Sequence, residues 1–218
     1  MVESASVWPD FPQQRHGFPA QGSRLFLHFG ALTRAIALRI SSISASLRPP
    51  VKTLLLMRHA KSSWRDAGLE DHERPLNGRG RRAAPYMGKL LAERGLTPDH
   101  ILTSSALRAQ DTARTVAQEL AYAGPFEVTR RLYLADPKTY LAALADLPPS
   151  VQRPLIVGHN PGISELVFEL TGTELDMPTA AVALIEVPTQ DWSSFPERGA
   201  AKLAGYFRPP KEDKKSKG

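Results

Sequence analysis

The chain has 218 residues, enough for one domain of ordinary size with extensions at its ends. It contains no cysteine, which excludes disulfides, thiolate metal sites and phosphatases with a cysteine nucleophile. Its net charge of +6 comes from the ends, because residues 1–50 and 208–218 each carry +3, whereas residues 51–207 hold 18 basic and 18 acidic residues. A neutral folded part argues against a nucleic-acid-binding domain.

Residues 1–50 do not show the alternation of strands and helices that follows them. Prolines interrupt their first half, and residues 23–46 have the pattern of an amphipathic helix. The apolar run of this helix is broken by Arg34 and is too short to span a membrane, and no signal peptide is recognisable. We expect a disordered or dispensable extension of a cytoplasmic protein; the alternatives are a start of translation at Val51 and an organelle transit segment. Residues 208–218 are expected to form a charged, disordered tail.

The first predicted strand ends on a cation and an imidazole. Val51 to Met57 is an apolar run of strand length, typical of a strand buried on both faces of a parallel sheet. Arg58 and His59 follow it directly. Ligands of open parallel sheets bind beyond the carboxyl ends of the strands, so this pair is a candidate for a binding site, although such a pair alone is more usually solvated.

The rest of the folded part alternates between strand and helix patterns. Short apolar runs predict strands, and apolar residues at helical spacing predict helices. The alternation predicts a single three-layer α/β/α domain over residues 51–207, with a mostly parallel central sheet. The further strands are expected at 100–103, 126–128, 154–158, 181–187 and 202–207, and the helices at 78–93, 106–120, 140–147 and 161–171.

Several residues are suited to helix ends. Asn77, Ser105 and Asn160 are expected to be N-caps of the helices that follow them. Pro161 suits the first helical position after Asn160. Pro85 is expected to kink or delay its helix.

Three strand ends bring four chemically active side chains to one edge of the predicted sheet: Arg58, His59, Arg108 and His159. Two guanidinium groups can grip phosphate oxygens through paired hydrogen bonds, and the helix that begins near Asn160 offers free N–H groups to an anion. One imidazole can attack phosphorus while the other stabilises charge. The set predicts a phosphoryl site that needs no metal and no other cofactor, and the scattered histidines show no zinc pattern.

Three stretches carry these residues: LMRHA at 56–60, SSALRAQDTA at 104–113 and VGHNP at 157–161. Together they resemble the signature stretches of the histidine phosphatase superfamily, which has the phosphoglycerate mutase-like fold. KSSW at 61–64 and DHERPLNGRG at 71–80 are similar to its SixA-like phosphohistidine phosphatase branch. The resemblance covers residues 51–207.

The resemblance implies a hydrolase that acts in two steps. His59 would attack phosphorus and become phosphorylated, and water would then hydrolyse the phosphohistidine. Arg58, Arg108 and His159 would hold the phosphoryl oxygens. His59 has to be neutral for attack, and His159 is better placed as a cation. The implied partner is a phosphorylated substrate, such as a signalling protein that bears phosphohistidine.

The proton donor is less well defined. Asp71 is a tentative acid, and a salt bridge to Arg74 or plain solvation is the alternative; Asp136 is the other candidate. Asn160 is expected to bind the substrate together with Arg58, Arg108 and His159. Arg74 and Ser104 are further candidates for substrate binding, although a serine there more often caps a helix.

Other functions stay open at this point. A broad small-molecule phosphomonoesterase would use the same four side chains. A non-catalytic phosphate-binding module is disfavoured because none of the four is missing. A mutase is disfavoured because only 49 positions separate His59 from Arg108, which leaves little room for an inserted segment over the site.

Overall fold

The computed structural model describes residues 50–65 and 67–210. The predicted extension, apart from Pro50, and residues 211–218 of the predicted tail lie outside the described residues. The strands of the described part are β1 (Val51–Arg58), β2 (His100–Ser104), β3 (Phe126–Thr129), β4 (Pro154–Gly158), β5 (Val182–Pro188) and β6 (Lys202–Phe207). Its helices are α2 (Gly78–Glu93), α3 (Leu107–Glu119), α4 (Pro137–Ala145) and α5 (Gly162–Thr171), with short 3₁₀ turns η1 (Asp71–Glu73) and η2 (Arg130–Leu132).

The strands form one sheet in the order β3-β2-β4-β1-β5-β6. β3, β2, β4 and β1 are mutually parallel, and β5 and β6 complete the sheet in antiparallel directions. The register pairs Arg58 with Gly158 and Thr103 with Val157. The parallel strands β1, β2 and β4 therefore end at the same edge, and the residues that follow them emerge side by side.

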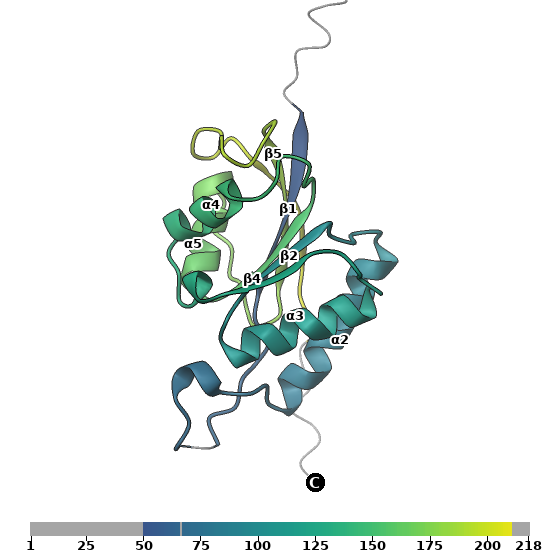
Figure 1. Ribbon diagram of the computed structural model, residues 1–218, viewed down its shortest axis with the longest axis vertical. Coiled ribbons are helices and arrows are strands. Elements are labelled where there is room, and N and C mark those ends of the chain that lie inside the picture. The colour runs from purple at the N-terminus through teal and green to yellow at the C-terminus, as the bar shows by residue number, and fades with distance from the viewer. Residues whose placement is uncertain (1–49, 66, 211–218) are drawn as a thin grey trace, which may run out of the picture. The chain divides into compact units, whose positions relative to one another are not determined.

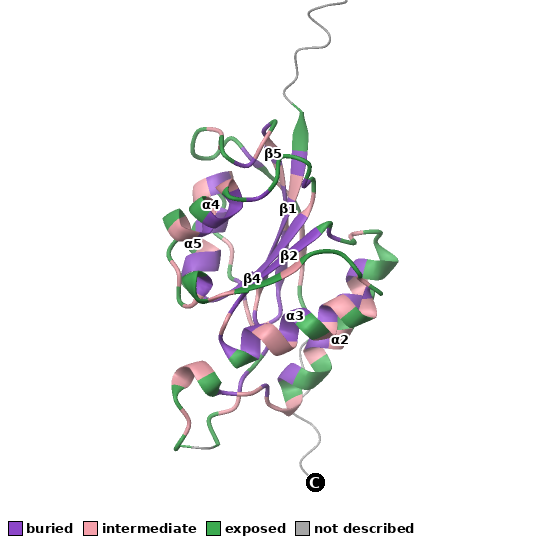
Figure 2. Ribbon diagram, viewed as in Figure 1, coloured by how far each residue is buried: buried purple, intermediate pink, exposed green. Residues whose placement is uncertain are grey.

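Two pairs of helices cover the sheet (Figure 1). Leu54 and Leu56 of β1 pack with the helices α4 and α5, whereas Leu55 and Met57 pack with α2 and α3. All four side chains are fully buried. Figure 2 shows the centre of the sheet in the colour of buried residues. The continuous apolar run of β1 is thus explained by burial on both faces, where each large aliphatic side chain contributes about 1.5–3 kcal/mol. The predicted three-layer α/β/α fold is confirmed.

The predicted start of α2 is confirmed, because the side chain of Asn77 accepts a hydrogen bond from the backbone N–H of Gly80. Pro85 lies inside α2, which runs without a break from Gly78 to Glu93. The predicted delay of this helix is therefore wrong. Ala84 and Met87 next to it are fully buried, and such packing outweighs the local preference of proline.

Two predicted N-caps are wrong. Ala106 occupies the N-cap position of α3, and the hydroxyl of Ser105 contacts His72 instead. Pro161, not Asn160, occupies the N-cap position of α5, after a cis peptide bond between the two residues. Both serine and asparagine are held by partners distant in sequence, which their local spacing does not reveal.

None of the helices in residues 50–65 and 67–210 is both long and apolar enough to cross a membrane.

Candidate active site

His59 lies directly after β1 and is only 8% exposed. Its Nδ1 lies 2.7 Å from the carbonyl oxygen of Ala60. A carbonyl oxygen can only accept, so Nδ1 carries the proton and Nε2 keeps a free lone pair. Burial lowers the pKa of His59 to about 4; the hydrogen bond to Ala60 opposes this shift, and the charges of Arg108 and Arg58 add to it. His59 is therefore neutral at pH 7 and has an unprotonated nitrogen.

His159 follows the neighbouring strand β4, and the centres of the two imidazole rings lie 5.0 Å apart. Its Nδ1 lies 3.5 Å from a guanidinium nitrogen of Arg108, and its Nε2 lies 2.8 Å from the hydroxyl of Ser104. Because a guanidinium only donates, Nδ1 is the acceptor and Nε2–H donates to Ser104. Burial, then the neighbouring His59 and Arg108, lower the pKa of His159 to about 3. His159 is therefore neutral at pH 7, and the expectation that this imidazole is a cation is wrong.

Arg58 supplies a guanidinium next to the two imidazoles. Its NH1 group donates to the carbonyl oxygen of Met177 over 2.9 Å, and Asn160 donates to the same oxygen over 3.1 Å. The Nε of Arg58 and the Oδ1 of Asn160 are buried without a hydrogen-bond partner in the described residues. A buried N–H without a partner is costly, so Arg58 retains a donor that an anion in the site would satisfy.

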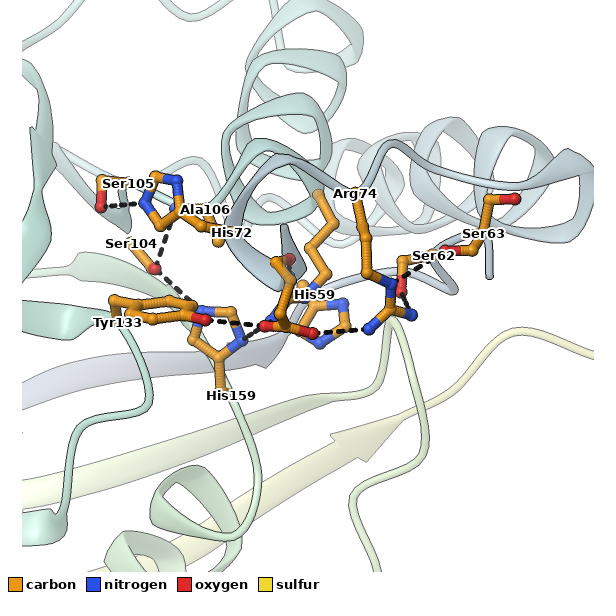
Figure 3. Close-up of polar contacts among 12 residues, drawn as sticks. His59, Ser62, Ser63, His72, Arg74, Ser104, Ser105, Ala106, Tyr133 and His159 are labelled. Carbon is orange, nitrogen blue, oxygen red and sulfur yellow. Dashed lines mark hydrogen bonds and ion pairs between the residues drawn. The ribbon is translucent and has the colours of Figure 1, made fainter. Parts of the chain in front are cut away.

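The carboxylate of Asp71 bridges two arginines from different parts of the chain. Figure 3 shows two of the side chains around it, Arg74 beside Ser62 and Tyr133 beside His159. Its Oδ1 lies 2.6 Å from Arg74, and its Oδ2 lies 2.9 Å from Arg108 and 2.7 Å from the hydroxyl of Tyr133. Partial burial favours a raised pKa, but the hydrogen bonds from Tyr133, Arg74 and Arg108 outweigh it and lower the pKa of Asp71 to about 2. The salt bridge to Arg74, expected as the alternative role of Asp71, is confirmed, and the carboxyl is ionised at neutral pH.

Arg74 is 6% exposed, and its guanidinium is occupied by contacts with other residues of the site. Besides Asp71, it donates to the hydroxyl of Ser62 over 2.6 Å and to the carbonyl oxygen of Ser63 over 2.9 Å. Its guanidinium lies over the ring of Trp64, 3.1 Å from the ring centre. Arg74 therefore ties the segment after His59 to the 3₁₀ turn η1.

Two further residues at this site, Tyr133 and His72, were not identified from the sequence. The ring of Tyr133 stands edge-on to the rings of His159 and His72, at 5.6 and 4.9 Å between centres. His72 contacts the hydroxyl of Ser105 over 2.8 Å. η1 is thus attached to the site through both Asp71 and His72. The contacts of Tyr133 and His72 have no local signal in the sequence. Among the contacts of η1, only the salt bridge between Asp71 and Arg74 has one, because the two residues are three positions apart.

The remaining candidates have structural contacts of their own. Asp136 is fully exposed and caps α4, where its carboxylate accepts from the backbone N–H of Thr139 over 2.8 Å. These hydrogen bonds lower the pKa of Asp136. The hydroxyl of Ser104 is bound to His159 and also accepts from the backbone N–H of Ala106 over 3.3 Å. Because the pKa values of Asp71 and Asp136 are both lowered, neither candidate acid carries a proton at neutral pH.

The two buried imidazoles predict that stability falls in mild acid. In the unfolded chain both titrate near pH 6.5, whereas in the folded protein the pKa values of His59 and His159 are about 4 and about 3. Below pH 6.5 the unfolded chain binds more protons, so the free energy of unfolding decreases as the pH falls. Between pH 7 and pH 5 we expect each histidine to account for a loss of about 2 kcal/mol.

Urea unfolding at the two pH values measures this loss. A double variant with His59→Gln and His159→Gln should lose less stability over the same interval than the unchanged protein. An equal loss in both proteins would contradict the burial of two neutral imidazoles.

Comparisons with known proteins agree with this geometry. The family model of the histidine phosphatase superfamily (branch 1) matches residues 54–133. An uncharacterized protein of Mycobacterium tuberculosis is 35% identical over 167 residues, which cover 70% of this chain and 99% of the relative.

Solved structures show the same similarity. A protein of Agrobacterium tumefaciens assigned as the phosphohistidine phosphatase SixA has 27% identity and a TM-score of 0.63, covering 72% of this chain and 98% of that one. The protein histidine phosphatase SixA complexed with tungstate has 26% identity and a TM-score of 0.62, and the match covers 72% of this chain and 96% of that one. The chain belongs to the histidine phosphatase superfamily and is a phosphatase with the phosphoglycerate mutase-like fold.

Proposed function

We propose that this phosphatase removes the phosphoryl group from phosphohistidine on a protein, through an intermediate phosphorylated on His59. In the first step Nε2 of His59 attacks phosphorus, and the bond from phosphorus to the substrate imidazole breaks. In the second step water attacks phosphorus, the bond to His59 breaks, and orthophosphate leaves. The tautomer of His59, with its proton on Nδ1, supports the role of Nε2 as nucleophile.

The cationic groups of the site would hold the phosphoryl oxygens. Arg58 has a buried N–H that bonds to none of the described residues, and Arg108 is 3% exposed with its guanidinium directed at Asp71. A bound phosphoryl dianion would favour protonation of His159 at Nδ1, which could then donate to a phosphoryl oxygen. Because two arginines supply positive charge, we propose that the reaction needs no metal.

The observation that carries the choice of substrate is the ionised state of Asp71. A general acid has to carry a proton, and the carboxyl between Arg74 and Arg108 has a pKa of about 2. The site therefore suits leaving groups that depart without proton donation by a carboxyl. The imidazole of phosphohistidine can take up a proton from solvent on its other ring nitrogen before the bond to phosphorus breaks. The ester oxygen of phosphoserine is too weakly basic to do so, and it would have to leave as an alkoxide.

The proposal predicts a strong dependence on the leaving group. A phosphohistidine peptide should be hydrolysed roughly 10²- to 10⁴-fold faster, in kcat/KM, than the phosphoserine peptide of the same sequence, which is the range that general-acid catalysis contributes. A phosphate-release assay in EDTA measures both, with para-nitrophenyl phosphate as a third substrate. EDTA should not slow the reaction. Equal turnover of the two peptides would favour a broad phosphomonoesterase, and absence of turnover on all three substrates would refute the proposed activity.

A further inference from the structure

A basic groove lies beside the active site, between residues 61–65 and the start of α2. Its volume is about 910 Å³, far more than one phosphate group occupies. Among the described residues that line it, the charged side chains are all basic: Lys61, Arg65, Arg79, Arg81 and Arg82. The folded part of the chain is neutral as a whole, so this groove is a local concentration of positive charge.

The groove shares a wall with the catalytic centre. Lys61 follows His59 by two residues, and Ser62, which also lines the groove, holds Arg74 through its hydroxyl. Trp64 lines the groove and lies under the guanidinium of Arg74. A molecule seated in the groove would therefore contact the loop that follows His59, on residues that also hold Arg74.

Three of the exposed cations of the groove are available to a ligand. Lys61, Arg65 and Arg79 are exposed, and in the described part of the chain no carboxylate forms an ion pair with them. These three lie on two segments, so they face the groove from the loop after β1 and from the first turn of α2. Trp64 is 74% exposed and adds an apolar ring at the same place. Separated positive charges with an aromatic ring fit an extended chain with several carboxylates better than a single small anion.

We propose that this groove binds an acidic segment of the substrate protein next to its phosphorylated residue. The inference rests on the proposed phosphohistidine phosphatase activity, since it identifies the kind of protein that would be its substrate. The groove would raise the rate of encounter and the affinity for substrates with acidic flanking residues, and it would not take part in the chemistry.

Two phosphohistidine peptides test this inference, one with a run of Glu beside the phosphorylated residue and one with a run of Gln. The test variant combines Arg65→Glu and Arg79→Glu, neither of which lies in the catalytic machinery. A glutamate in the first turn of a helix is favourable, so Arg79→Glu should not destabilise α2. Lys89→Glu is the matched control, because Lys89 is exposed on the same helix about 15 Å farther along its axis.

The double variant should lower kcat/KM for the Glu peptide roughly tenfold and leave the Gln peptide and para-nitrophenyl phosphate unchanged. Lys89→Glu should change none of the three. Salt should weaken turnover of the Glu peptide alone, because screening reduces attraction between exposed charges. Equal turnover of both peptides by the unchanged protein and the double variant would overturn the inference while leaving the phosphatase activity intact.

A binding measurement separates the groove from the chemistry. A fluorescein-labelled Glu peptide without phosphate should bind the His59→Ala protein, and its Kd should rise roughly tenfold when the two groove substitutions are added. This result is independent of whether phosphohistidine is the substrate. If pyrophosphate, and not the Glu peptide, loses affinity in the double variant, the groove is a site for a second phosphate group and the inference is wrong.

Discussion

Replacing His59 by alanine is expected to lower kcat by roughly 10⁴- to 10⁶-fold, the scale observed when a covalent nucleophile is removed. The neighbouring imidazole of His159 is held by other contacts and cannot take its place without rearrangement. Its Nδ1 accepts from the guanidinium of Arg108, and its Nε2–H donates to the hydroxyl of Ser104. Phosphate release from para-nitrophenyl phosphate and from a phosphohistidine peptide measures the effect.

The matched control is His100→Gln. His100 is also a buried histidine, but it lies at the start of β2, at the opposite end of that strand from Ser104. This variant should keep the activity of the unchanged protein, and thermal unfolding should show that both variants are folded. Residual activity of His59→Ala above about a tenth of the unchanged protein would contradict covalent catalysis by His59.

Arg108→Lys is expected to lower kcat/KM by about 10²- to 10³-fold, the range measured when a preorganised donor to a developing charge is removed. The charge is kept, but a lysine cannot reproduce the planar fork of donors that contacts both the backbone carbonyl and the carboxylate of Asp71. The same substitution also removes the guanidinium that faces Nδ1 of His159. Inhibition by orthophosphate should weaken in parallel, because the same donors bind the product.

Arg114→Lys is the control for this effect. Arg114 is exposed on the same helix and lies over the ring of Phe126, away from the catalytic residues. This change should leave both kcat/KM and phosphate inhibition as they are. If Arg108→Lys retains full activity, Arg108 does not hold the phosphoryl group and the proposed arrangement fails.

The fold could be predicted from the sequence because its signals are local. The apolar runs before Arg58 and His159 identified two central strands, and Asn77 identified the start of α2. The rule that parallel strands end at one edge then placed the key side chains together, and the structure has them there. Their roles in catalysis stay predictions.

The contacts around Asp71 could not be predicted, because they join distant parts of the chain. Tyr133 is 62 positions from Asp71, and Arg108 is 37 positions away. From the sequence alone, Asp71 is a carboxyl in the loop after the nucleophile, which is a position suited to a general acid. In the structure its hydrogen bonds to Tyr133 and two arginines keep it ionised. The neutral state of His159 likewise depends on burial beside two cations, which no local pattern encodes.

A chemical quench of a single turnover tests the central claim most directly. The protein is mixed with substoichiometric phosphohistidine peptide, quenched in alkali, in which phosphohistidine survives, and digested for mass spectrometry. A phosphoryl group on the peptide that contains His59, rising and then decaying as orthophosphate forms, is the predicted result. Orthophosphate formation with no label on His59 at any time, or a label on His159 instead, would contradict the proposed mechanism.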